Sequence, residues 1–181
     1  MNSSKPRFDV VGQLGSLRRY ARSLTAGGED AEDLVHDALV RAYERRNTFR
    51  SGGNLRAWLL SILHNVFIDR MRSRKSEAAR EELAGQLVES AVGASQEHAV
   101  RLAQIRKAFL DLPQEQRSAL DLVAIEGLGY QEAANILGIP VGTLMSRIGR
   151  ARAALRKVED GEAASRRDHL RIVGGRDGPV V

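Results

Sequence analysis

Basic residues are the side chains in this 181-residue chain that are best suited to chemistry, and one run of them near the C-terminal end contains no acidic residue. Between positions 143 and 157 there are five basic residues and no acidic one: Arg147, Arg150, Arg152, Arg156 and Lys157. An arginine guanidinium can donate two parallel hydrogen bonds to a phosphate or to the edge of a guanine. A solvated helix end would show the same composition, because positive charge is also favoured at a helix C-terminus. The order of the residues around this basic run favours nucleic-acid binding.

Residues 130–148 have the pattern of a helix-turn-helix. Ala133 and Ala134 are small enough for two helices to approach closely. Gly138 can take the left-handed conformation that ends a helix, and Ile139 can fill the space between the two helices. Helical spacing gives the second helix an apolar stripe of Leu144, Ile148, Ala151 and Leu155, and an opposite side of Thr143, Ser146, Arg147 and Arg150. We predict that this opposite side enters a major groove of DNA.

Helical periodicity divides the rest of the chain into two groups of elements. In the first group we expect helices over about 8–25, from the N-cap candidate Asp30, and from the N-cap candidate Asn54. In the second group the period resumes near 98, stops at Pro113, and returns over 115–126, 130–137 and 141–157. The fold prediction is all-α, with two small helical domains at 8–75 and 98–158, each with its own core. A flexible linker at 76–97 joins them, and a mobile tail follows at 159–181.

Composition restricts the classes of function. Lys plus Arg is 28 and Asp plus Glu is 23, so the net charge is +5 and the pI is near 10.1, which suits a polyanionic partner without requiring one. There is no Cys, so thiolate metal sites are excluded, and His36 and His64 lack companion ligands at metal spacing. We expect both histidines at the surface or facing a partner. Without a Gly-rich phosphate loop or a paired histidine and carboxylate, we expect no enzyme activity, no catalytic residue, no metal and no cofactor.

The chain also has no apolar run near the roughly 20 residues that span a bilayer. We therefore expect a cytoplasmic protein without membrane insertion.

Two strings in the first half, DAEDLVHDALVRA at 30–42 and NLRAWL at 54–59 continuing to HNVFIDR at 64–70, resemble region 2 of the extracytoplasmic-function (ECF) sigma factors. Leu112-Pro113 and the segment from Glu126 onward resemble region 4 of the same family, so the likeness extends over about 8–157. It implies a region 2 helical bundle and a region 4 helix-turn-helix. It also implies a protein that binds core RNA polymerase and directs promoter recognition and DNA melting.

The resemblance assigns roles to three sets of residues. It places the polymerase contact on α-helical positions Asp33, Asp37, Arg41 and Glu44, and the contact with the promoter −10 element on Asn65, Asp69, Arg70 and Arg72. It places the contact with the promoter −35 element on the outer side of the helix-turn-helix, at Thr143, Ser146, Arg147 and Arg150. Without the family, Asp33 to Glu44 would be read as an ordinary solvated face with an Asp37–Arg41 pair. Trp58 could stack on a base, but its spacing with Leu55, Leu59 and Ile62 favours the core.

Within the family, the elements PVGTLMSR at 140–147 and LHN at 63–65 resemble proteobacterial stress-response members, which implies an anti-sigma factor as a further partner. The sequence departs from common versions at Gly129, where Ser or Thr often caps a helix, and at Gly149 inside the recognition helix. Two other hypotheses fit part of the pattern. One is a helix-turn-helix regulator that acts without core polymerase, and the other is a sigma-like decoy of an anti-sigma factor.

Overall fold

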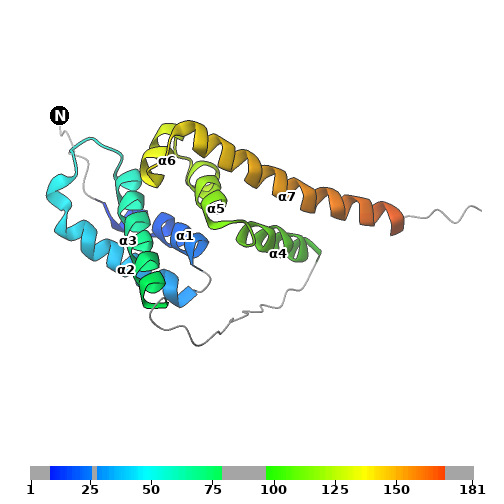
Figure 1. The fold of residues 1–181 in the computed structure, drawn as a ribbon, viewed down its shortest axis with the longest axis horizontal. Coiled ribbons are helices and arrows are strands. Elements are labelled where there is room, and N and C mark those ends of the chain that lie inside the picture. Colours follow the sequence, from blue (N-terminus) through cyan, green and yellow to red (C-terminus); the bar gives the residue numbers. More distant parts are fainter. Residues whose placement is uncertain (1–8, 26–27, 79–96, 170–181) are drawn as a thin grey trace, which may run out of the picture.

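The computed structural model describes residues 9–25, 28–78 and 97–169, and every regular element in these ranges is helical, which confirms the all-α prediction (Figure 1). In chain order the elements are η1 (Val11–Gln13), α1 (Leu14–Leu24), α2 (Gly28–Glu44), η2 (Arg46–Thr48), α3 (Leu55–Ala78), α4 (Glu97–Leu110), α5 (Gln114–Leu120), the π-helical turn η3 (Asp121–Ile125), α6 (Tyr130–Leu137) and α7 (Val141–His169).

The first half is a three-helix bundle of α1, α2 and α3. Its centre is apolar, and Leu17, Leu34 and Leu63, one from each helix, are at most 1% exposed. The expected cap of α3 is present, because the Oδ1 of Asn54 accepts a hydrogen bond from the backbone N–H of Ala57 at 3.2 Å. The bundle is therefore held by burial of the apolar faces that the sequence pattern predicts.

Trp58 lies on the side of α3 that faces this bundle. It is half-buried, it packs against the core, and its ring centroid is 5.4 Å from that of Phe49. This position supports the interpretation of Trp58 as a packing residue.

The second half begins with α4 and turns at Pro113 into α5. Helices α5, α6 and α7 enclose Leu122, Ala133 and Leu144, each with 0% exposure. The predicted helix over 115–126 is α5 followed by the π-helical turn η3, whose capping bond runs from the N–H of Glu126 to the carbonyl of Asp121 at 2.9 Å. This wider turn places Glu126 and Asp121 on the side of the second half that faces α1.

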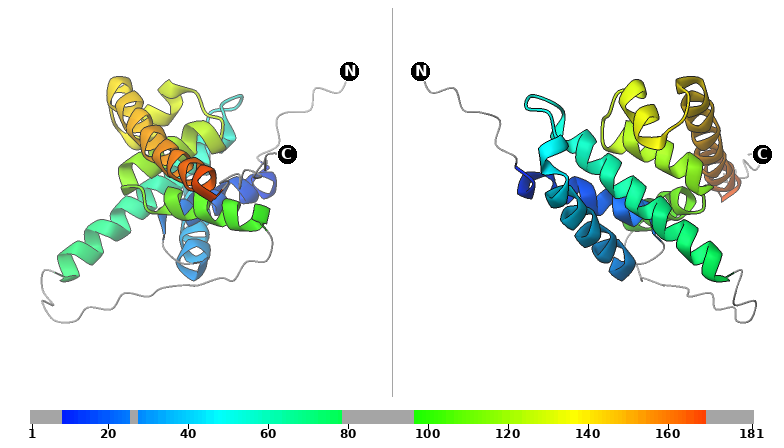
Figure 2. Two further views of the ribbon diagram at one scale, coloured as in Figure 1. Left: turned by 90° about the vertical axis from the view of Figure 1, so that its right-hand side faces the viewer. Right: turned by 60° about the vertical axis from the view of Figure 1, so that its left-hand side comes forward.

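The two halves pack against each other, with α1 against α5 and η3 and α3 against α6 (Figures 1 and 2). One continuous cluster of buried residues runs through both of them. The cores of the two predicted domains are therefore continuous with each other within the described residues. The physical reason is that α1 carries a second buried face, of small and polar residues, that periodicity of large apolar residues does not detect.

Two expected boundaries also change. Helix α7 continues to His169, so the first part of the predicted tail, 159–169, is helical, and the remainder, 170–181, lies outside the described residues. Its sequence, EDGEAASRRDH, holds one Gly among several good helix formers, and helix propensity permits the extension. The predicted linker covers residues 76–97. Residues 76–78 belong to the end of α3 and Glu97 begins α4, and residues 79–96 lie outside the described ranges.

Candidate nucleic-acid interface

The helix-turn-helix forms as the sequence predicts. Gly138 ends α6 with a φ of 64°, and its N–H and that of Ile139 bond back to the last turn of α6 at 3.3 and 3.1 Å. At the start of α6, Glu132 accepts a hydrogen bond from the N–H of Gly129 at 3.2 Å. This bond is the half of a capping box that does not depend on the side chain of residue 129, and the half that a Ser or Thr there would supply is absent.

Helix α7 presents a polar outer side to solvent. Leu144, Ile148 and Ala151 are buried to 2% exposure or less, and they fix the rotation of the helix. As a result Thr143, Ser146 and Arg150 are exposed, and so are Arg152, Arg156 and Lys157 further along. Since none of these six residues forms an ion pair among the described residues, their charge and hydroxyl groups are available to a partner.

Arg147 behaves differently from the rest of the predicted set. Its side chain is only 21% exposed and pairs with Glu115 of α5 at 2.6 Å. Arg150 instead donates to the hydroxyl of Ser146 at 2.9 Å on the outer side of α7. The structure therefore groups Thr143, Ser146 and Arg150 together and turns Arg147 toward α5.

On α3, two of the four predicted DNA-contact residues are tied to α2. Arg70 bonds both the carboxylate of Asp37 and the carbonyl oxygen of Asp33, the latter at 3.0 Å. Arg41 bonds Asp69 at 3.0 Å. The ion pairs of this surface thus run between the helices and not between Asp37 and Arg41 along α2.

The remaining residues predicted to contact polymerase or the −10 element point outward. Asn65 and Arg72 on α3, and Asp33 and Glu44 on α2, are exposed. None of these four side chains has a hydrogen bond or ion pair within the described part of the chain. The two sets predicted from the sequence therefore form one continuous charged surface over α2 and α3.

His64 contradicts the surface prediction. It is 7% exposed, and its Nδ1 lies 2.9 Å from the hydroxyl of Tyr20, which is completely buried. Burial lowers the pKa of His64 to about 4, so the ring is neutral at pH 7. Burial also raises the pKa of the Tyr20 phenol, and the charge of Asp121 adds to that effect while the hydroxyl of Ser118 opposes it. His36 is exposed, as predicted.

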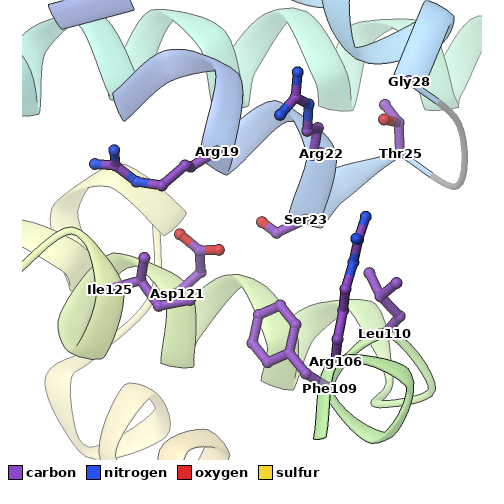
Figure 3. A pocket seen from close by; sticks show the side chains of 10 residues that line it. All are labelled: Arg19, Arg22, Ser23, Thr25, Gly28, Arg106, Phe109, Leu110, Asp121 and Ile125. Atoms are coloured by element: carbon purple, nitrogen blue, oxygen red, sulfur yellow. The ribbon is translucent and has the colours of Figure 1, made fainter. Parts of the chain in front are cut away.

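A second polar centre, between the two halves, escaped the sequence analysis. Glu126 is 1% exposed and accepts hydrogen bonds from Ser16 and, at 3.0 and 3.2 Å, from Arg19. Asp121, also 1% exposed, lies below Ser23 and Arg19 of α1 in Figure 3. The available signal was the spacing of Ser16, Arg19 and Ser23, which puts three polar residues on one face of a helix that also has an apolar face.

Burial raises the pKa of Asp121 to about 7. The Ser23 hydroxyl lowers it, the charge of Glu126 raises it, and Arg19 and Arg117 lower it. Loss of hydration is therefore the dominant effect on this carboxyl group.

No cluster of three or more potential metal ligands occurs within residues 9–25, 28–78 and 97–169. In the same ranges no helix is both long enough and apolar enough to cross a membrane.

Comparison with known families gives two matches, in the order of the two halves. The family Sigma-70 region 2 matches residues 12–77, and the family Sigma-70, region 4 matches residues 102–155. The first match contains α1 to α3, and the second contains the helix-turn-helix.

Individual relatives agree with these matches. The chain is 38% identical to the ECF RNA polymerase sigma factor EcfG of Rhodopseudomonas palustris over 95% of this chain and 96% of the relative. Among solved structures it is similar to the sigma factor RpoE in complex with the anti-sigma factor NepR from Bartonella quintana, with 37% identity, a TM-score of 0.73, and coverage of 84% of this chain and 94% of that one. It is also similar to CnrH in complex with the cytosolic domain of CnrY, with 30% identity, a TM-score of 0.60, and coverage of 88% and 91%.

Proposed function

Because the chain belongs to the ECF RNA polymerase sigma factors, we propose that it binds core RNA polymerase and directs it to promoters through one surface on each half. The observation that carries this proposal is the pairing, in one chain, of an exposed helix-turn-helix face with a charged face over α2 and α3. Polymerase supplies the catalysis, so the chain itself needs no catalytic residue.

We assign the −35 contact to the outer side of α7. Thr143 and Ser146 stand in the first two turns of the helix, where recognition helices reach base edges, and Arg150 follows one turn later. Arg147 is held by Glu115, so it serves best as a phosphate clamp or as a residue that positions α7 against α5.

We assign the −10 contact to Asn65 and Arg72, whose side chains are free to meet a displaced strand. Asp69 and Arg70 act with them by fixing α3 against α2 through their pairs with Arg41 and Asp37. On this assignment the −10 surface and the polymerase surface are mechanically linked, because the same ion pairs join both.

We assign core polymerase binding to the exposed acidic residues of α2, chiefly Asp33 and Glu44, with Asp37 and Arg41 beside them. Reversal of charge at Asp33 and Glu44 leaves every ion pair between α2 and α3 intact, whereas reversal at Asp37 would break the contact with Arg70. The double change Asp33→Lys with Glu44→Lys should weaken co-purification with core enzyme. Glu29→Lys, an exposed acid in the first turn of α2, is the control that should retain it.

We further propose that the protein acts in a stress response and that a separate inhibitor protein regulates it. Two similar structures are complexes, one with the anti-sigma factor NepR and one with the cytosolic domain of CnrY, and the EcfG relative is aligned over almost its whole length. We infer an anti-sigma factor that contacts both halves and a cytoplasmic site of action.

Two alternatives make different predictions. A regulator independent of polymerase should bind its promoter with full affinity in the absence of core enzyme. A decoy should bind an anti-sigma factor but leave core polymerase inactive at promoters. The uninterrupted basic side of α7 is not needed by a decoy and favours the sigma function.

Run-off transcription tests the proposal directly. Core polymerase is supplied with the upstream region of this chain's own gene, with and without the protein. We expect a discrete transcript only when both are present, a strong reduction with Arg150→Ala, and full output with Arg50→Ala, an exposed arginine of the other half. If wild-type protein adds no transcript to core enzyme on any promoter, the proposed function is wrong.

A further inference from the structure

One large apolar side chain stands exposed near the start of α7. Met145 is 57% exposed, whereas Leu144 beside it and Ile148 one turn later are at most 2% exposed and belong to the core. A single exposed apolar residue is common on protein surfaces and carries no inference by itself. The position of Met145 gives it meaning, because it lies in the first two turns of the helix whose outer side we assign to the −35 element.

Met145 forms one edge of this outer side. Successive residues of a helix are turned by about 100°, so Ser146 lies about 100° from Met145 in one direction and about 60° from Thr143 in the other. The exposed arc therefore runs from Met145 through Ser146 to Thr143, and the buried Leu144 lies opposite its middle. A helix is about 10–12 Å across and the major groove is about 12 Å wide, so both edges of the arc approach the groove walls.

The neighbours of Met145 along the exposed side leave it uncovered. They are Gly142, one turn before, and Gly149, one turn after, and a Cβ placed at either position meets open space. Side chains of a helix also point back toward its N-terminus. The side chain of Met145 is therefore directed over the first turn of α7, where recognition helices meet the edges of bases, and it is accessible there.

The chemistry of a thioether restricts what Met145 can recognise. Its sulfur has no proton to donate and is only a weak acceptor, so it cannot read the pattern of donors and acceptors on base edges. The apolar group that the major groove presents is the C5-methyl group of thymine. Methionine is unbranched and has three rotatable bonds, so its side chain can adapt to a contact of this kind.

We propose that Met145 is a specificity-determining residue that packs against the C5-methyl group of a thymine in the −35 element. The inference rests on the proposed function, since it names the base feature that the outer side of α7 selects. Arg150, which donates to Ser146 in the free protein, supplies hydrogen bonds to bases or phosphates, and Met145 supplies an apolar contact. Promoters used by this chain should therefore hold an A·T pair at one fixed position of the −35 element.

Deoxyuridine provides the test, because it differs from thymidine only in lacking the C5-methyl group. The holoenzyme, which is core polymerase with the whole protein, is titrated with promoter fragments from the upstream region of this chain's own gene. Each thymine on either strand of the segment that the holoenzyme protects near −35 is replaced singly by deoxyuridine. Wild type should bind one of these fragments about three- to fivefold more weakly, which is the effect of removing one buried methyl group.

Variants of Met145 connect this base to the side chain. Met145→Ala should bind the thymine fragment about three- to fivefold more weakly than wild type, and it should no longer distinguish thymine from deoxyuridine at that position. Met145→Leu, which keeps an apolar side chain, should retain most of the discrimination. Arg150→Ala is the matched control, because it should bind both fragments more weakly but keep the difference between them. Since Met145 is exposed, its variants should unfold in urea as wild type does.

The inference is wrong if no single deoxyuridine weakens binding by wild type, or if Met145→Ala stays sensitive at the same position. In either case the exposed methionine meets solvent or a protein partner instead of a base. If wild-type holoenzyme still prefers the promoter to unrelated DNA in that experiment, the proposed function stands and only the role of Met145 is rejected. A wild-type holoenzyme without that preference would overturn the proposed function, and this inference with it.

Discussion

Replacing Asp121 by asparagine should change how the stability of this protein depends on pH. Burial raises the pKa of Asp121 to about 7 in the folded protein, against an ordinary value of 3.8. Between these two values the folded state holds a proton that the unfolded state has released, so the free energy of unfolding falls as pH rises. Below pH 4 and above pH 7 this group contributes no further change. The asparagine side chain has the shape of the protonated acid and cannot lose a proton.

The size of the effect follows from the two pKa values. Each unit of difference is worth 1.36 kcal/mol, so the stability of Asp121→Asn relative to wild type should increase by roughly 4 kcal/mol between pH 4 and pH 7. Comparison with wild type at each pH cancels the contributions of all other titrating groups.

His64 should produce the opposite slope. Its pKa is lowered from 6.5 to about 4 by burial, so the unfolded state binds the extra proton in this window and stability rises with pH. Replacement by Gln should remove a gain of roughly 3 kcal/mol between pH 4 and pH 6.5. In wild type the contributions of these two groups nearly cancel over that range, so relative to wild type the stability should rise with pH in Asp121→Asn and fall with pH in His64→Gln.

Urea unfolding followed by circular dichroism, at half-unit steps from pH 4 to pH 8, provides the measurement. Parallel profiles for wild type and Asp121→Asn would show that Asp121 is ionised in the folded protein at low pH, and the argument from its burial would be refuted. An unchanged denaturant slope in both variants confirms that the comparison concerns the same transition.

Four further changes have defined outcomes. Gly138→Ala should destabilise the protein by about 1 kcal/mol because φ is 64°, whereas Gly149→Ala, which meets open space within a helix, should stabilise it by about as much, both measured by urea unfolding. Tyr20→Phe should cost about 1–3 kcal/mol by the same measurement, since it leaves the buried Nδ1 of the histidine beside it without a partner. Arg150→Ala should weaken binding to a −35 duplex by about 1–3 kcal/mol in a fluorescence titration if the arginine contacts a base, and affinity equal to wild type would place the DNA contact elsewhere.

Local pattern was sufficient to predict the elements and much of the candidate interface. The apolar stripes of α2, α3 and α7 gave three helices because a helix repeats every 3.6 residues and buries the side that is apolar. Gly138 identified the turn of the helix-turn-helix, since only a few residue types take its conformation readily. The exposure of Thr143, Ser146 and Arg150 followed from the same period.

Tertiary structure decided which polar residues meet. Nothing local distinguishes Arg147, which turns to Glu115, from Arg150, which stays on the outside, because the difference depends on where α5 lies. The pairs of Arg70 with Asp37 and Arg41 with Asp69 likewise depend on the packing of α3 against α2.

The same limit explains the error for His64 and the unpredicted contact between the two halves. A single histidine or glutamate in a sequence is most often solvated, and its burial requires partners that come from distant parts of the chain. For His64 the partner is Tyr20, 44 positions away, and for Glu126 the partners Ser16 and Arg19 are more than 100 positions away. The sequence by itself determined the helices and their apolar faces, because these depend on neighbours within a few turns. Only the tertiary structure decided that the two halves close on a buried carboxylate, because the free energy of a buried charge depends on groups brought together by the whole fold.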